Sequence, residues 1–418
     1  MSPAHIAIWS ISGISIILML LHPRDLSEAW WIGIGAVSLV VFRLVPLHLA
    51  LHAIAEGSDV YLFLAGMMLL AQLAQMHGVF DWLATIALQQ SRGSRTRLFS
   101  LIYLVGTFVT VFMSNDATAV VLTPAVLAAT RKSKVEPLPY LFICAFIANA
   151  ASFVLPISNP ANLVVFHTGM PPLGQWLRIF FVASILSIIA TWLALRWYCR
   201  KDLVGTIEDR TESPHLSEAG KLTLAGIAIV AAVLLTASAR GADLGLPTCI
   251  SAALIAAVIS IRERTRPAEL LSEISWSVLP LVAGLFILVE AINSAGALHL
   301  SQTALERLQH LPATAAAATA ALGVGIGTNL VNNLPLGLIA ASSIHATGIT
   351  GSLRNIILVG IDIGPNLSVT GSLATILWLI AIRKEGQNVS AWKFLKAGFF
   401  VMPPALALAT IAVSCFSR

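Results

Sequence analysis

The apolar run from Leu98 to Thr130 is interrupted near its centre by Ser114, Asn115 and Asp116. The length of this run predicts a membrane helix, but a continuous membrane helix would not carry three polar residues at mid-depth. Backbone that leaves the helix inside a bilayer is tolerated only where it is buried in protein or lines a cavity. Ionisable residues at that depth usually mark the path of an ion or a substrate. The interruption therefore predicts the tip of a re-entrant hairpin.

A second interruption, Asn332-Asn333, divides the apolar run from Ala313 to Ile344 in the same way. Basic residues flank the first run on both sides, at Arg95 before it and at Arg131 after it. A single crossing would separate these two positions, whereas a hairpin keeps both on one face, as the positive-inside rule favours. We expect two hairpins, 98–130 and 313–344, whose tips meet at one site.

The composition defines the class of protein. Of the 418 residues, 57% are hydrophobic and 11% are charged, against about 25% charged in an ordinary soluble domain. The predicted fold is therefore an all-α polytopic membrane protein with about ten transmembrane helices and two re-entrant hairpins. The first apolar run lacks a basic leader and a cleavage site, so it is expected to be a span. The expected continuous spans are His5–Leu21, Ala29–Pro46, Val60–Met76, Gly174–Tyr198, Lys221–Ser238, Leu244–Ile261, Ser275–Asn293 and Ala391–Val413.

Two further segments read as broken helices. Leu138–His167 contains Pro156 and Pro160, which interrupt a helix, and the stretch from Gly360 to Thr375 contains Pro365. We expect each segment to form two half-helices joined by an unwound link. An interfacial amphipathic segment is expected at 78–82.

The second half of the sequence repeats the first. Gly284 and Gly296 follow Gly66 and Gly78 at an offset of 218, and Asp362 and Thr375 follow Asn149 and Asn162 at an offset of 213. Residues 1–199 and 218–418 would each hold five spans and one hairpin, joined by a cytoplasmic linker at 200–217. Because five is odd, the second half enters from the opposite face, and such an inverted repeat is typical of transporters.

The charges orient the chain. With Arg95 and Arg131 in the cytoplasm, all but six of the 25 basic residues lie on the cytoplasmic side. This asymmetry favours both termini outside. It also explains the net charge of +5 without a nucleic-acid partner.

The two tips and the two links together form the predicted site. Its substrate-binding residues would be Ser114, Asn115, Asn159, Asn162, Asn332, Asn333, Ser372 and Thr375. Asp116 and Asp362 are the candidates for proton coupling, since a carboxyl group in a low dielectric can load and release a proton near neutral pH. The alternative is that these side chains only cap broken helices, because Ser, Asn and Asp are the preferred N-caps.

The site chemistry limits the substrate. No Lys or Arg is expected at mid-depth, so an anion would lack a counter-charge, whereas a neutral polyhydroxyl species or a cation would suit amides, hydroxyls and carboxylates. The four cysteines are isolated, and we expect Cys144 to serve packing. No cofactor, metal site or catalytic residue is expected, since no Walker sequence and no HExxH or GxSxG motif occurs.

Residues 62–84, 112–123, 148–166, 329–338 and 360–378 resemble the ArsB family of arsenite and antimonite efflux transporters in the ion transporter superfamily. The pattern from Leu62 to Ala84 is the most specific of these, and the resemblance covers nearly the whole chain. It implies export of arsenite, as As(OH)3, and of antimonite across the inner (plasma) membrane by proton antiport. It also implies association with an ATPase of the ArsA type in some members of the family.

The same residues also fit other functions. A sodium-coupled carboxylate or sulfate importer of the same superfamily is disfavoured by the missing buried cation, although bound Na+ could substitute for it. A Na+/H+ antiporter would fit the two Asp residues. A channel is disfavoured by the occluding hairpins and the inverted symmetry. A membrane enzyme is disfavoured because no nucleophile and base are paired.

Overall fold

The computed structural model describes residues 2–21, 26–167, 169–207, 215–264 and 266–416. These residues form helices, and one isolated β-bridge joins Ser94 and Thr206. Nine of the described helices are long and apolar enough to cross a membrane, when Val278–Gln309 is counted as one helix. The chain is thus an all-α polytopic membrane protein. Part of the expected linker, 208–214, lies outside the described residues.

The first half of the chain contains the continuous helices α1 (Pro3–Leu21), α2 (Glu28–Val41), α3 (Leu47–Glu56), α4 (Ser58–Met76), α5 (Val79–Gln90) and α11 (Leu173–Tyr198). Its interrupted elements are α6 (Arg95–Phe112), α7 (Asn115–Ala117), a π-helical turn (Thr118–Leu122), α8 (Thr123–Lys132), α9 (Leu138–Ala150), a 3-10 turn (Pro156–Ser158) and α10 (Pro160–Val165).

The second half contains the continuous helices α12 (Glu218–Ala239), α13 (Gly245–Glu263), α14 (Pro267–Ser272), α15 (Val278–Ile292), a π-helical turn (Asn293–Ala297), α16 (Leu298–Gln309) and α21 (Ala391–Phe416). Its interrupted elements are α17 (Ala313–Val331), α18 (Asn333–Thr347), α19 (Ser352–Ile363), two 3-10 turns (Gly364–Leu367 and Val369–Gly371) and α20 (Leu373–Lys384).

The two halves pack into each other rather than side by side. Helix α4 packs on α13, α15 packs on α2, and α11 packs on α21. The aligned glycines permit the first two contacts: a Cβ on Gly66 would lie 2.8 Å from the backbone of Thr248, and one on Gly284 would lie 2.7 Å from the side chain of Ile32. Gly78 and Gly296, the second aligned pair, both adopt positive φ, at 69° and 107°, which glycine tolerates without strain.

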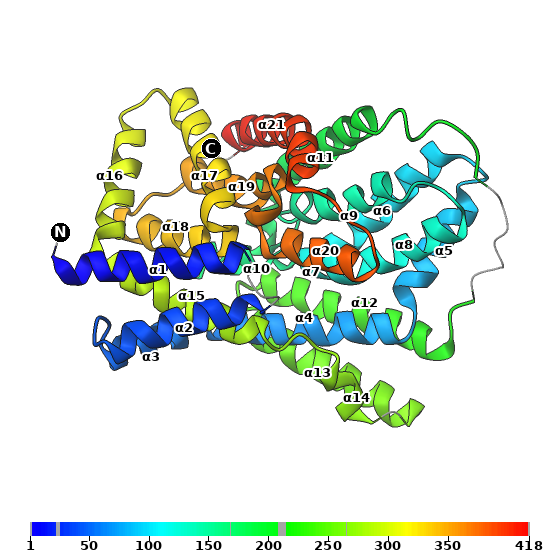
Figure 1. Cartoon of the computed structure of the whole chain (residues 1–418), viewed down its shortest axis with the longest axis horizontal. Coiled ribbons are helices and arrows are strands. Elements are labelled where there is room, and N and C mark those ends of the chain that lie inside the picture. The colour runs from blue at the N-terminus through cyan, green and yellow to red at the C-terminus, as the bar shows by residue number, and fades with distance from the viewer. Residues whose placement is uncertain (1, 22–25, 168, 208–214, 265, 417–418) are drawn as a thin grey trace.

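The chain turns back at the first interruption. Helix α9 begins six residues after α8 ends, and at its start the Tyr140 hydroxyl donates to the carbonyl of Arg95, the first residue of α6, at 3.2 Å. The end of α8 and the start of α6 therefore lie at the same face, as a hairpin requires. Figure 1 shows the start of α1 and the helices α3 and α16 toward the left, and the helices α5 and α8 toward the right.

Several details differ from the sequence expectation: the expected interfacial segment at 78–82 is the longer helix α5, α14 was not expected, and three further differences follow. The expected span Ala29–Pro46 ends at Val41 and is followed by the separate helix α3, because Pro46 starts a new helix. Helix α16 was not expected, although it follows Gly296 as α5 follows Gly78. The first arm of the first hairpin is also longer than expected, since Ser94 caps it at Arg97 and its 18 residues span about 27 Å.

Candidate functional site

Each hairpin tip is an unwound link that a side chain closes. At the first tip, the Ser114 hydroxyl accepts a hydrogen bond from the Ala117 N–H at 3.2 Å. At the second, Asn332 has φ 76°, and its side-chain oxygen accepts from the Leu334 N–H at 3.3 Å while its amide donates to the Thr370 carbonyl at 3.1 Å. Ser114 and Asn332 therefore act as N-caps, and they aim the starts of α7 and α18 at the centre of the molecule.

The second arms of the broken helices are capped in the same manner. Asn159 accepts from the Ala161 N–H at 3.0 Å and starts α10, and Ser372 accepts from the Thr375 N–H at 3.1 Å and starts α20. Four helix starts thus converge, and each presents partly unsatisfied N–H groups and a positive dipole end.

The two broken helices are joined across the halves by reciprocal hydrogen bonds. The Asn159 amide donates to Asp362 Oδ1 at 2.6 Å, and the Ser372 hydroxyl donates to Asn149 Oδ1 at 3.1 Å. Asn149 also donates to Asn366 Oδ1 at 3.0 Å. These bonds fix the relative position of the unwound links.

The predicted site residues divide into two groups. Asn115, Asp116, Asn159 and Asn333 line a central space between the tips, and Ser114 and Asp116 also line a larger cavity of about 240 Å³ beside it. The others lie behind this surface: Asn162 donates to the carbonyl of Ser152 at 2.8 Å, and the Thr375 hydroxyl donates to that of Val369 at 2.8 Å. Asn332, Ser372 and Asp362 are likewise held by the bonds given above.

Four buried oxygens of the predicted site residues have no hydrogen-bond partner among the described residues: Asn115 Oδ1, Asn162 Oδ1, Asn333 Oδ1 and Asp362 Oδ2. The Ser152 hydroxyl lies near Asp362 but donates to the Asn149 carbonyl at 2.8 Å. Because a buried polar atom without a partner costs free energy, the oxygens of Asn115 and Asn333, which line the central space, are suited to accept hydrogen bonds from a ligand, and that of Asp362 is suited to carry a proton.

The larger cavity is also lined by residues that are not among the predicted site residues. Gln72 and Gln75 of α4, Glu273 and Ser275 before α15, and Lys384 at the end of α20 line it together with Asp116. The two glutamines interrupt an apolar span, which is the signal that could have identified them. Lys384 lies at the far end of a 12-residue helix from Ser372, about 18 Å away. The central space is lined by no Lys or Arg among the described residues.

A separate pocket of about 430 Å³ lies on the opposite side of the central space, lined by Val60 and Leu163. Leu64 and Pro160 line the central space. The barrier between the pocket and the central space therefore runs from Val60 to Leu64 on α4 and from Pro160 to Leu163 on α10. This is about one helical turn on each helix. Val60 and Leu163 are almost fully buried.

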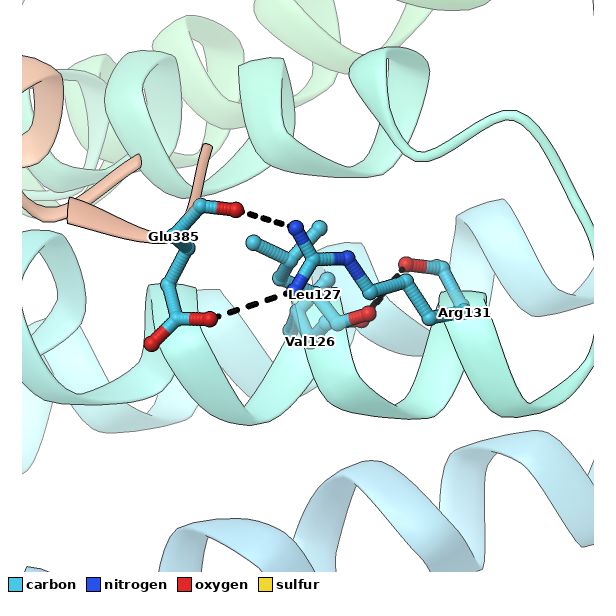
Figure 2. A network of polar contacts seen from close by, with 5 residues as sticks. Val126, Leu127, Arg131 and Glu385 are labelled. Carbon is cyan, nitrogen blue, oxygen red and sulfur yellow. Dashed lines mark hydrogen bonds and ion pairs between the residues drawn. The ribbon is translucent and has the colours of Figure 1, made fainter. Parts of the chain in front are cut away.

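An ion pair ties the first hairpin to the second half. Figure 2 shows the Arg131 guanidinium, at the end of α8, between the side chain and the backbone carbonyl of Glu385. Arg131 Nη1 lies 3.1 Å from Glu385 Oε2, and Nη2 donates to the Glu385 carbonyl. A second contact is its counterpart: Arg354 Nη2 donates to the Gly169 carbonyl at 3.1 Å, with the guanidinium 4.0 Å from the centre of the Phe166 ring. Arg131 of the first half therefore contacts the segment after α20, and Arg354 of the second half contacts the segment after α10.

Paired broken helices around a polar cavity in a helical membrane bundle define a transporter. The sequence profile of the CitMHS family, described as citrate transporter, matches residues 16–359. The chain belongs to this family. It is a multi-pass membrane protein, located in bacteria in the inner membrane.

Relatives and a solved structure agree with this assignment. The chain is 26% identical over 420 residues to an arsenical pump membrane protein of Escherichia coli strain K12, covering 96% of both chains. It is 24% identical to a putative arsenical pump membrane protein of Bacillus subtilis, covering 93% of this chain and 95% of that protein. The YdaH transporter of Alcanivorax borkumensis has the same fold, with a TM-score of 0.57 at 13% identity over 99% of this chain and 98% of that one. The family profile and the full-length relatives make the chain an ArsB-like ion transporter.

Proposed function

We propose that this protein exports arsenite, as As(OH)3, and antimonite from the cytoplasm in exchange for protons. The observation that carries the proposal is the central space lined by Asn115, Asp116, Asn159 and Asn333, with no basic residue among the described ones that line it. As(OH)3 is neutral, and its three hydroxyls can donate to the free amide oxygens and to a carboxylate. Citrate, the substrate in the family description, carries carboxylates that would need a cation here.

Proton coupling is assigned to Asp116 and Asp362. A neutral substrate gains nothing from the membrane potential, because that energy scales with transported charge, so uphill export needs a coupled ion. Asp116 faces the cavity and is accessible from it. Asp362 is fully buried with one amide donor, and an ionised carboxylate without a cation is costly at such a position.

We also propose that the halves 1–199 and 218–418 are inverted repeats that operate by alternating access. The cavity beside Asp116 extends to Glu273 and Lys384, on the side assigned to the cytoplasm. The opposite pocket ends at Val60 and Leu163. This geometry corresponds to an inward-open state in which one turn of α4 and of α10 closes the outer path.

The test uses everted membrane vesicles that contain only this protein, with an acidic lumen and no ATP. Arsenite uptake should follow the proton gradient and collapse with a protonophore. Asp116→Asn should reduce uptake to the level of empty vesicles, whereas the control Asp81→Asn, an exposed carboxylate on α5, should transport normally.

Other results would redirect the assignment. Normal uptake by Asp116→Asn would remove Asp116 from the coupling. Uptake only with ATP and a soluble ATPase of the ArsA type would make the chain the membrane subunit of a pump. No arsenite uptake under either condition would favour the alternative, a sodium-coupled anion or Na+/H+ transporter. That alternative predicts substrate uptake or proton movement that depends on a sodium gradient.

A further inference from the structure

A groove of about 470 Å³ runs along the outside of the first hairpin, between α6 and α11. The two helices are antiparallel, because the Tyr103 hydroxyl donates to the Ile188 carbonyl at 2.6 Å, while Thr96 at the start of α6 donates to the Leu203 carbonyl beyond the end of α11 at 3.3 Å. The groove extends on α6 from Arg97 to Thr107, about 15 Å. This is about half of a 30 Å hydrocarbon core, the depth of one leaflet.

The walls of the groove suit a hydrocarbon chain. Leu101, Leu104, Ile188 and Ile189 line it, and Leu104 is 65% exposed. The hydroxyls in the groove are already bonded within the protein, since that of Ser100 donates to Thr96 and that of Thr107 donates to Tyr103. An acyl chain would therefore leave none of these hydroxyls without a partner.

The cytoplasmic end of the groove is positively charged from both walls. Tyr103 lies opposite Ile188, and Arg97 is six residues before Tyr103. Because the helices are antiparallel, the level of Arg97 is about six residues after Ile188, near the last turn of α11. Arg196 is in that turn, and its guanidinium lies 5.1 Å from the centre of the Trp192 ring, which itself lines the groove. Both arginines are exposed, and among the described residues no ion pair joins either to a carboxylate.

We propose that this groove binds an anionic glycerophospholipid of the cytoplasmic leaflet. Its phosphate lies between Arg97 and Arg196, one acyl chain lies along Leu104 and Ile189, and Trp192 sits at the headgroup level, where tryptophan is favoured. Basic pockets between membrane helices recognise anionic headgroups in this way. The bound lipid braces α6, the arm that ends at the tip carrying Asp116.

The experiment uses the purified full chain in detergent and native mass spectrometry. Phosphatidylglycerol and phosphatidylcholine with identical acyl chains compete for the protein in equal amounts. The wild type should retain phosphatidylglycerol preferentially. Each of Arg97→Gln and Arg196→Gln should lower that preference about fivefold, and the double variant about thirtyfold, since one basic residue near an anionic lipid contributes about 1 kcal/mol.

The matched control is Lys396→Gln, which removes a cation beside a tryptophan, Trp392, at a position that does not line the groove. It should keep the wild-type preference. Equal retention of both lipids by the wild type, or an unchanged preference in the double variant, would overturn the proposal. Because binding is read without transport, its failure leaves the proposed function untouched.

Discussion

In each half of the chain, the residue that caps the second arm of the broken helix donates to the first arm of the broken helix in the other half. Asn159 donates to Asp362 and Ser372 donates to Asn149. Donors and acceptors are each 213 residues apart, so the two bonds occupy equivalent places. They differ in chemistry, because one acceptor is an amide with its hydrogen bonds made and the other is a carboxyl group with one oxygen unpaired.

The hairpin tips show the same contrast. Asp116 of the first tip corresponds to Asn333 of the second at an offset of 217 residues, and both line the central space. Each equivalent pair thus contains one carboxyl group and one amide, and the two carboxyl groups lie in opposite halves. The two sequence-equivalent pairs thus differ in the same way, and their carboxyl groups are the ones to which the proposed function assigns the protons.

After Asp116→Asn, the substitution expected to reduce proton-driven arsenite uptake most is Asp362→Asn. In Asp362→Asn, an amide replaces the carboxyl group and makes this position resemble Asn149, so proton-driven arsenite uptake should fall to the background of empty vesicles. Downhill arsenite exchange should persist, because the central space keeps its lining. The measurement compares proton-driven uptake with exchange at equal pH. Proton-driven accumulation at the wild-type level would show that Asp362 has only a structural role.

A paired substitution separates the structural and functional parts of the crossing bonds. Asn159→Ala and Ser372→Ala each remove an N-cap and one crossing bond, and each should lower the free energy of unfolding by about 1–3 kcal/mol. Only Asn159→Ala also changes the surroundings of Asp362, so the pH dependence of transport should shift in that variant and stay unchanged in Ser372→Ala. Thermal melting and pH profiles check the pair. Equal pH profiles in both variants would mean that Asn159 acts on stability alone.

Much of this fold follows from the sequence. The breaks at Ser114 and Asn332, and those near Pro156 and Pro365, are where the structure unwinds, because polar residues and prolines at mid-membrane leave few alternatives. Helices α3 and α16 were missed because their short amphipathic patterns resemble loops. The offset of 218 that relates α5 to α16 could have identified the latter.

The site was less predictable than the fold. Composition selects the polar residues at a break, but it cannot tell which of them face the cavity. Asn159 and Asn162 differ by three positions, yet Asn159 lines the central space while Asn162 bonds to backbone carbonyls. That distinction depends on the direction of each side chain in the unwound link, which only the packed structure fixes.

The smallest effects are expected at the two arginine contacts, which differ in their exposure. The Arg131 and Glu385 side chains are 45% and 48% exposed, so Arg131→Gln should lower the free energy of unfolding by about 1 kcal/mol or less. Arg354 is partly buried against Phe166 and bonded to Gly169, so Arg354→Gln should cost more, about 1–2 kcal/mol. Raising the salt concentration should erase the first effect and spare most of the second, since exposed pairs are screened more strongly. Equal salt sensitivity in the two variants would show that both contacts are solvated alike and that burial does not distinguish them.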